Sequence, residues 1–260
     1  MTDVEVLPAV RRRDFHFDLF IPLLIRPRKA METISAQTRS IWLMPLLILS
    51  VLALAAVMVA GPLRRQALLN QPVEYPQGYE YWPQEMQQQF EQARTAAAGP
   101  MITHGFPALA ALTGIWAGWL ILGALLHLSL TLLGSRAGNV AAMNVVAWAS
   151  LPFGVRYLVQ IAAMLVIRQT ITKPGLSGFV PADGGNLVLF LGFLLTAVDL
   201  YLIWQIVLIT IGARIMSGLK IGKVLVGVLV AALVVLLLRA VPGFVGAKLG
   251  SLSIVRPFFF

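Results

Sequence analysis

Five stretches of this chain are apolar and long enough to cross a lipid bilayer, which takes roughly 20 residues of helix. They cover residues 41–60, 106–133, 143–167, 187–211 and 221–241. Hydrocarbon offers no hydrogen bonds to a backbone amide, so each stretch is expected to form a helix. The predicted fold class is therefore an all-α membrane protein, built as a bundle of five transmembrane helices.

The composition supports a location in the bilayer. Hydrophobic residues make up 58% of the chain and charged residues 12%, whereas soluble domains are nearer half apolar and a quarter charged. Cysteine is absent, which excludes thiol catalysis, cysteine-ligated zinc and disulfides. The net charge of +9 is expected to set orientation and attract anionic lipid, and no nucleic-acid partner is predicted.

Basic residues before the first span predict how the chain is inserted. They are Arg11, Arg12, Arg13, Arg26, Arg28, Lys29 and Arg39. Cytoplasmic loops of membrane proteins carry such an excess of positive charge. We therefore expect a cytoplasmic N-terminus, and five crossings make residues 242–260 an extracytoplasmic tail.

The N-terminal segment, residues 1–40, contains a second apolar region. Asp14–Ile25 is too short to span and suits a segment that lies in the membrane interface. The adjacent Arg26, Arg28 and Lys29 would contact anionic lipid headgroups there. The alternative is that these charges only enforce orientation.

The first external loop, residues 61–105, is long and contains a predicted helix. Its first half is rich in proline and aromatic rings, which suit the headgroup layer. Residues 83–99 have the proline start, early acidic residue and Gly-Pro stop of a short helix. One face of this helix carries Met86, Phe90, Ala93 and Ala97. That face is expected to pack on the protein's own helices or to dock a partner outside the membrane.

Two opposite charges lie inside the predicted spans. Arg156 in the third span and Asp199 in the fourth are equally far from the middle of the connecting loop, so an antiparallel hairpin places them at similar depth. Buried charges of this kind face a partner or a cavity. Gln160 falls on the same helix face as Arg156. The pair would fix helix packing or form a polar step in a transport path. If the third helix instead starts at Pro152, Arg156 lies near the surface and Asp199 needs another partner.

Two weaker features lie in the second span. His127 is a candidate ligand for a cofactor, although no second ligand stands at metal spacing, so no cofactor and no metal are predicted. Gly114 and Gly118 form a small-xxx-small pattern that lets another helix approach, within the chain or from a second subunit. Nucleotide-binding, metalloprotease and serine-hydrolase motifs are missing, and we expect no enzyme activity.

The order of these features resembles the bacterial branch of the Yip family, multi-pass proteins whose eukaryotic members interact with Rab/Ypt GTPases. The resemblance covers roughly residues 15–240. The matching segments are LLIRPRKAMETI, AMNVVAWASLPFGVR and LYLIWQIVLITIGARIMSGLKIGKVLV, with Pro27, Pro152, Trp204 and the junction from Ser217 to Lys223. The resemblance implies a five-helix bundle with a cytoplasmic N-terminus. It also implies an accessory membrane subunit, because some bacterial members are associated with export systems. The eukaryotic Asp-Tyr-rich N-terminal motif is missing, so Rab binding is not carried over.

Three functions remain open from the sequence. The favoured one is a non-catalytic accessory or assembly subunit of a larger complex in the bacterial cytoplasmic membrane, such as an ABC-type exporter. The second is a small-solute or lipid transporter that uses Arg156 and Asp199. The third is a pigment- or cofactor-binding subunit of an electron-transfer or light-harvesting complex, with His127 as ligand.

Overall fold

A computed structural model describes residues 17–73, 75–181 and 184–252, and within these residues all regular structure is helical. The elements are η1 (Phe17–Leu19), α1 (Phe20–Ile25), α2 (Pro27–Ser35), α3 (Leu43–Leu69), η2 (Tyr79–Tyr81), α4 (Gln84–Ala97), η3 (Met101–Gly105), α5 (Phe106–Leu132), α6 (Asn139–Ala149), α7 (Pro152–Ile167), η4 (Gly175–Phe179), α8 (Asn186–Leu195), α9 (Leu200–Ser217) and α10 (Ile221–Leu252). Five helical segments in this part of the chain are long and apolar enough to cross a membrane. The predicted fold class is confirmed.

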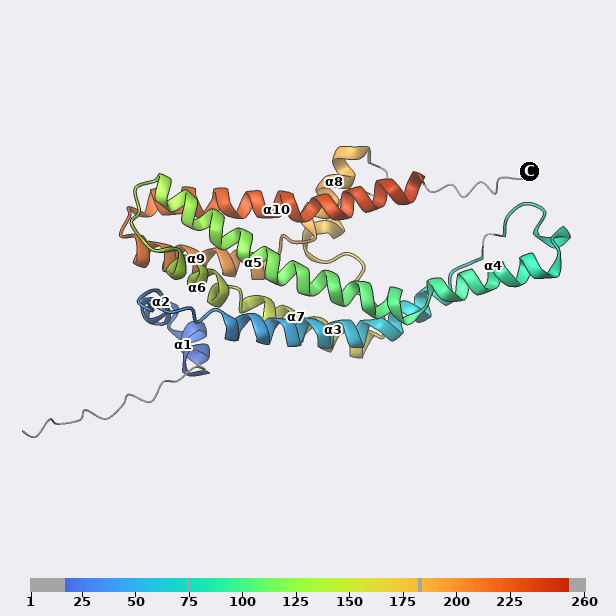
Figure 1. Cartoon of the computed structure of the whole chain (residues 1–260), viewed down its shortest axis with the longest axis horizontal. Coiled ribbons are helices and arrows are strands. Elements are labelled where there is room, and N and C mark those ends of the chain that lie inside the picture. Colours follow the sequence, from blue (N-terminus) through green and yellow to red (C-terminus); the bar gives the residue numbers. More distant parts are fainter. Residues whose placement is uncertain (1–16, 74, 182–183, 253–260) are drawn as a thin grey trace, which may run out of the picture.

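The long helices lie side by side along the longest axis of the molecule (Figure 1). Helix α3 packs against α7 and α5, and α5 in turn packs against α6 and α10. Helices α1 and α2 lie at one end of the bundle, whereas α4 projects beyond the other end. Helix α5 is apolar around its whole circumference, as expected of a helix that faces lipid on one side and other helices on the other.

The N-terminal segment takes part in the core. Helix α2 packs against α9 and α6, and its Ala30, Met31 and Ile34 are completely buried. Helix α1 still exposes Ile21 and Ile25, as an interfacial helix would. Residues 14–16 of the predicted interfacial segment lie outside the described residues. The sequence analysis treated the start of α2 only as a basic cluster and did not predict that this helix is buried, although Ala30, Met31 and Ile34 share one face at helical spacing.

Helix α6 holds the chain where it enters the first span. The Asn144 side chain accepts a hydrogen bond from the backbone N–H of Ile41 at 2.9 Å and donates one to the carbonyl of Arg39 at 2.8 Å. One turn later, the indole of Trp148 donates to the carbonyl of Ile41 at 3.2 Å. Both side chains are completely buried. These bonds satisfy backbone groups that lie outside any helix.

Close packing between α9 and α6 leads to a first prediction. A Cβ at Gly212 would lie 2.5 Å from Cγ1 of Val145, so Gly212→Ala should destabilise the fold by about 1–3 kcal/mol. Gly222 is the matched control, because a Cβ there meets nothing within 4 Å and alanine favours helix by roughly 0.5–1 kcal/mol. We expect a lower Tm in detergent for Gly212→Ala and an equal or higher Tm for Gly222→Ala. Equal Tm values for both variants would contradict this packing.

The first predicted span does not stop at Gly61 and Pro62. Helix α3 continues through Pro62 to Leu69 and, with α4 and η3, forms a hairpin that extends the bundle. The missing Cβ of Gly61 lets the His104 ring lie against the backbone. Arg64 donates from Nη1 to the carbonyl of Thr103 at 3.4 Å. These contacts between α3 and η3 support the helix past its proline.

The tip of the hairpin is held by aromatic rings. Phe90 of α4 lies with its ring centroid 5.4 Å from that of Tyr79 and 6.3 Å from that of Trp82. Tyr75 stacks beside Tyr79 at 4.6 Å. Helix α4 buries none of its residues. Of the predicted apolar face, Phe90 packs on the rings of the loop, whereas Met86, Ala93 and Ala97 are exposed.

Candidate functional site

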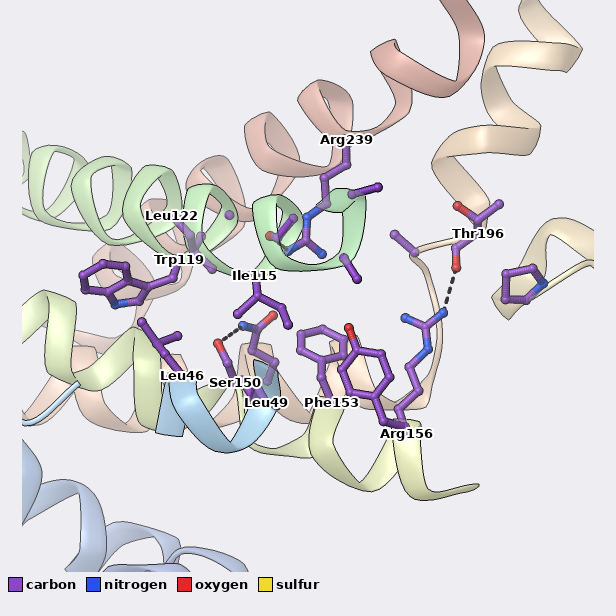
Figure 2. A pocket seen from close by; sticks show the side chains of 18 residues that line it. Leu46, Leu49, Ile115, Trp119, Leu122, Ser150, Phe153, Arg156, Thr196 and Arg239 are labelled. Carbon is purple, nitrogen blue, oxygen red and sulfur yellow. Dashed lines mark hydrogen bonds between the residues drawn. The ribbon is translucent and has the colours of Figure 1, made fainter. Parts of the chain in front are cut away.

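A cavity of about 370 Å³ lies between α3, α5, α7, α10 and the segment that joins α8 to α9 (Figure 2). Its lining combines two arginines, Arg156 and Arg239, with several large apolar side chains. These elements are far apart in the sequence but meet at this cavity. The segment between α8 and α9 closes one side of the cavity, and its backbone explains how the site forms.

The predicted fourth span, residues 187–211, is not one helix. Helix α8 ends at Leu195 and α9 begins at Leu200, and in Figure 1 α8 runs across α10 and not alongside it. The break occurs because Asp199 adopts an extended backbone and caps α9, its Oδ1 accepting the N–H of Leu202 at 3.0 Å. The carbonyl of Val198 is satisfied by the N–H of Leu176 in η4 at 3.0 Å. An irregular backbone at membrane depth requires such partners.

Arg156 and Asp199 form an ion pair at this break. Arg156 Nε lies 3.1 Å from Asp199 Oδ2, and the side chains are 19% and 14% exposed. Arg156 Nη2 also donates to the carbonyl of Thr196 at 3.2 Å, a bond drawn in Figure 2. Although α7 starts at Pro152, α6 precedes it in the same candidate span. A start at Pro152 therefore does not place Arg156 at the end of that span.

Gln160 does not join this pair. It lines a neighbouring cavity of about 320 Å³ together with Arg64. Tyr157 lines both cavities and lies between the two sites on α7. The predicted polar group on α7 is thus divided between two spaces.

The second arginine, Arg239, is the residue that sequence reasoning missed. The fifth span was expected to end near residue 241, yet α10 continues through Pro242 to Leu252. Arg239 points from α10 into the cavity, where Nη2 lies 3.4 Å from the carbonyl oxygen of Gly114 (Figure 2). Among the described residues, no carboxylate lies within ion-pair distance of it.

The predicted small-residue pair makes room for this guanidinium. A Cβ on Gly118 would lie 2.6 Å from Arg239 Nη2, whereas a Cβ on Gly114 would meet nothing within 4 Å. Helices α5 and α10 pack against each other within the chain. The glycines therefore serve an intramolecular approach in which an arginine, and not only a helix backbone, fills the gap.

The rest of the cavity is mostly apolar. Leu46, Trp119 and Leu122 line the end away from the arginines (Figure 2). Between the ends, Gln205 donates to the Ser150 hydroxyl at 2.8 Å, and both side chains are nearly buried. The cavity is thus cationic at one end and hydrophobic at the other.

The other predicted sites lie elsewhere. His127 is half-buried on α5, and the described residues contain no group of three or more His, Asp or Glu side chains that could hold a metal ion. Arg26, Arg28 and Lys29 are exposed beside α1, and Arg28 makes an exposed ion pair with Glu32 at 3.4 Å. None of these residues lines the cavity.

Comparison with known proteins gives one result. Residues 21–241 match the family model of the Yip1 domain. Neither the search of curated proteins nor that of solved structures gave a match. The match covers most of the chain, from the buried N-terminal helices to the arginine of α10. The chain therefore belongs to the Yip1 family of multi-pass membrane proteins.

Proposed function

We propose that this protein is a non-catalytic accessory or assembly subunit of a larger complex in the bacterial cytoplasmic membrane, such as an ABC-type exporter. In this arrangement the N-terminus is cytoplasmic and the α3–α4 hairpin is extracytoplasmic, in agreement with the basic residues that precede the first span. The hairpin is the observation that carries the proposal.

The hairpin offers a surface that the bundle itself does not use. Helix α4 has 14 residues and buries none of them. Isolated helices shorter than about 12–15 residues are marginal in water, so a helix of this kind gains stability from a partner. Helix α4 ends at Ala97, and a short turn at residues 98–99 leads into η3, which runs directly into α5 (Figure 1). A polar helix beyond the membrane is suited to contact a neighbouring subunit.

Site-specific photocrosslinking tests this proposal. A photoreactive amino acid at Gln89 or Gln92, both exposed on α4, should give a crosslink to one membrane protein in native membranes. The same group at Lys173, exposed in the loop between α7 and η4, is the control and should give little of that product. Failure to crosslink from α4, together with recovery of a free monomer after gentle extraction, would contradict the proposal.

A second candidate function is the handling of a lipid or small solute. The cavity beside Arg156 and Asp199 favours it, because buried charges in membrane proteins mark the paths of polar ligands. A protein of this kind must first bind something in the cavity. His127 has no comparable surroundings, and the cofactor-binding function has no structural observation in its favour.

A further inference from the structure

The cavity carries a positive charge that the described residues do not neutralise. Asp199 pairs with Arg156, so that among the described residues the guanidinium of Arg239 has the carbonyl of Gly114 as its hydrogen-bond partner. Arg156 lines the same cavity, and the two guanidinium groups carry like charges. A guanidinium has five N–H donors and stays protonated, so most of its donors are available to a ligand.

The donors face the cavity from opposite sides. Arg239 enters from α10 and Arg156 from α7, and the space between them belongs to the cavity (Figure 2). Gly118 leaves room for the Arg239 guanidinium at this position, because a Cβ there would lie 2.6 Å from its Nη2. An anion bound there would neutralise Arg239 and gain from the nearby Arg156.

The depth of Arg239 indicates where such an anion comes from. Arg239 follows the start of α10 at Ile221 by about 18 residues, or roughly 27 Å of helix. A hydrocarbon core is about 30 Å thick, so the guanidinium lies near the far headgroup layer if α10 starts at the near one. Lys220 and Lys223 at the start of α10 suit such a boundary. Phosphate groups of lipids are concentrated at this depth.

We propose that the cavity binds the phosphate group of an anionic amphiphile, with the phosphate at Arg239 and the apolar part toward Leu46, Trp119 and Leu122. Guanidinium groups bind phosphate oxygens through two parallel hydrogen bonds. The opposite end of the cavity is apolar, so it can contact a hydrocarbon chain but offers a purely polar solute no polar partners. The site is separate from the hairpin, so it does not depend on the partner-binding role.

Native mass spectrometry of the purified full chain tests the site. The protein is extracted in mild detergent and mixed with equal amounts of dioleoylphosphatidylglycerol and dioleoylphosphatidylcholine. We expect one phosphatidylglycerol to be retained preferentially, and Arg239→Gln to reduce this retention about tenfold or more, the value of one charged hydrogen bond. Wild-type retention in Arg239→Gln would overturn the proposal.

Matched variants separate the cavity from the basic surface and from misfolding. Gly118→Ala should lower retention because its Cβ would displace Arg239, whereas Gly222→Ala, which lies outside the cavity lining and whose Cβ would meet nothing within 4 Å, should bind as the wild type does. The double variant Arg28→Gln, Lys29→Gln removes exposed charge away from the cavity and should keep the preferential lipid. If that variant loses the lipid and Gly118→Ala retains it, the site is at the surface and the proposal fails.

Inorganic phosphate distinguishes the source of the anion. Addition of millimolar phosphate should leave the bound phosphatidylglycerol in place, since phosphate cannot use the apolar end. Displacement of the lipid by phosphate alone, lost again in Arg239→Gln, would support the arginine site but overturn the amphiphile as its ligand. These outcomes do not involve the hairpin, so they leave the test of the partner-binding proposal untouched.

Discussion

Asp199→Ala is expected to lower the free energy of unfolding by about 3–5 kcal/mol, since removal of one partner leaves a buried charge without compensation. The carboxylate has two roles, as the ion-pair partner of Arg156 at 3.1 Å and as the N-cap of α9 through Leu202 at 3.0 Å. Loss of the cap alone costs about 1 kcal/mol. The variant should therefore unfold at a much lower temperature in detergent, as measured by circular dichroism.

Two further variants divide this effect between its causes. Asp199→Asn keeps an oxygen for the cap and removes only the charge, so its destabilisation reports on the ion pair. Combining it with Arg156→Gln removes both charges and should recover part of the loss, as a double-mutant cycle measures. Arg28→Gln is the control, because its pair with Glu32 is exposed and worth less than about 1 kcal/mol. If Asp199→Ala is no more harmful than Arg28→Gln, the pair does not stabilise the fold.

The sequence was sufficient for the number of candidate spans, and it offered the pairing of Arg156 with Asp199 as one of two arrangements. Hydropathy over a 20-residue window depends on composition, and composition does not change when a helix bends or breaks. Equal spacing about the loop placed the two charges together because the loop brings the chain back on itself. Such signals follow from local sequence and from helix geometry.

The break between α8 and α9 was not predicted for the same reason. Residues 187–211 are apolar almost throughout, so hydropathy indicates one helix and treats Asp199 as an isolated charge. The available signal was the residue type, since aspartate favours the N-cap position. Whether it caps a new helix depends on partners for the freed carbonyls. Those partners, Arg156 and Leu176, come from elsewhere in the chain.

Arg239 was missed because the fifth span was expected to end at residue 241, just before Pro242, which places this arginine at the end of the helix. Proline stops helices in water, but membrane helices tolerate it where neighbouring groups satisfy the backbone. Its environment also depends on Gly118 of α5, more than 100 residues earlier in the chain. The small-residue pair was visible in the sequence, but nothing in its spacing shows that an arginine occupies the gap. Tertiary packing decides this.

Trp148→Ala should destabilise the protein by about 3–5 kcal/mol, the cost of truncating a large buried aromatic side chain. Trp148 is completely buried in α6, and its ring lies 5.4 Å from that of Phe20. Its indole N–H also binds the carbonyl of Ile41, which lies just before α3. One side chain thus joins α1, α6 and the entry to the first span, so its loss should loosen all three.

Two further variants test the cause of the destabilisation in Trp148→Ala: Trp148→Phe isolates the hydrogen bond, and Trp82→Ala is a control in the hairpin. Phenylalanine keeps most of the apolar volume but leaves the Ile41 carbonyl without its donor, which costs about 1–3 kcal/mol. Trp82 lies in the hairpin, where α4 buries no residue, so Trp82→Ala should change the Tm of the bundle little. Limited proteolysis should cut near residues 36–42 faster in Trp148→Ala than in Trp82→Ala. Equal cleavage in the two variants would contradict this prediction, because it would show that the Trp148 indole does not hold the N-terminal helices on α6.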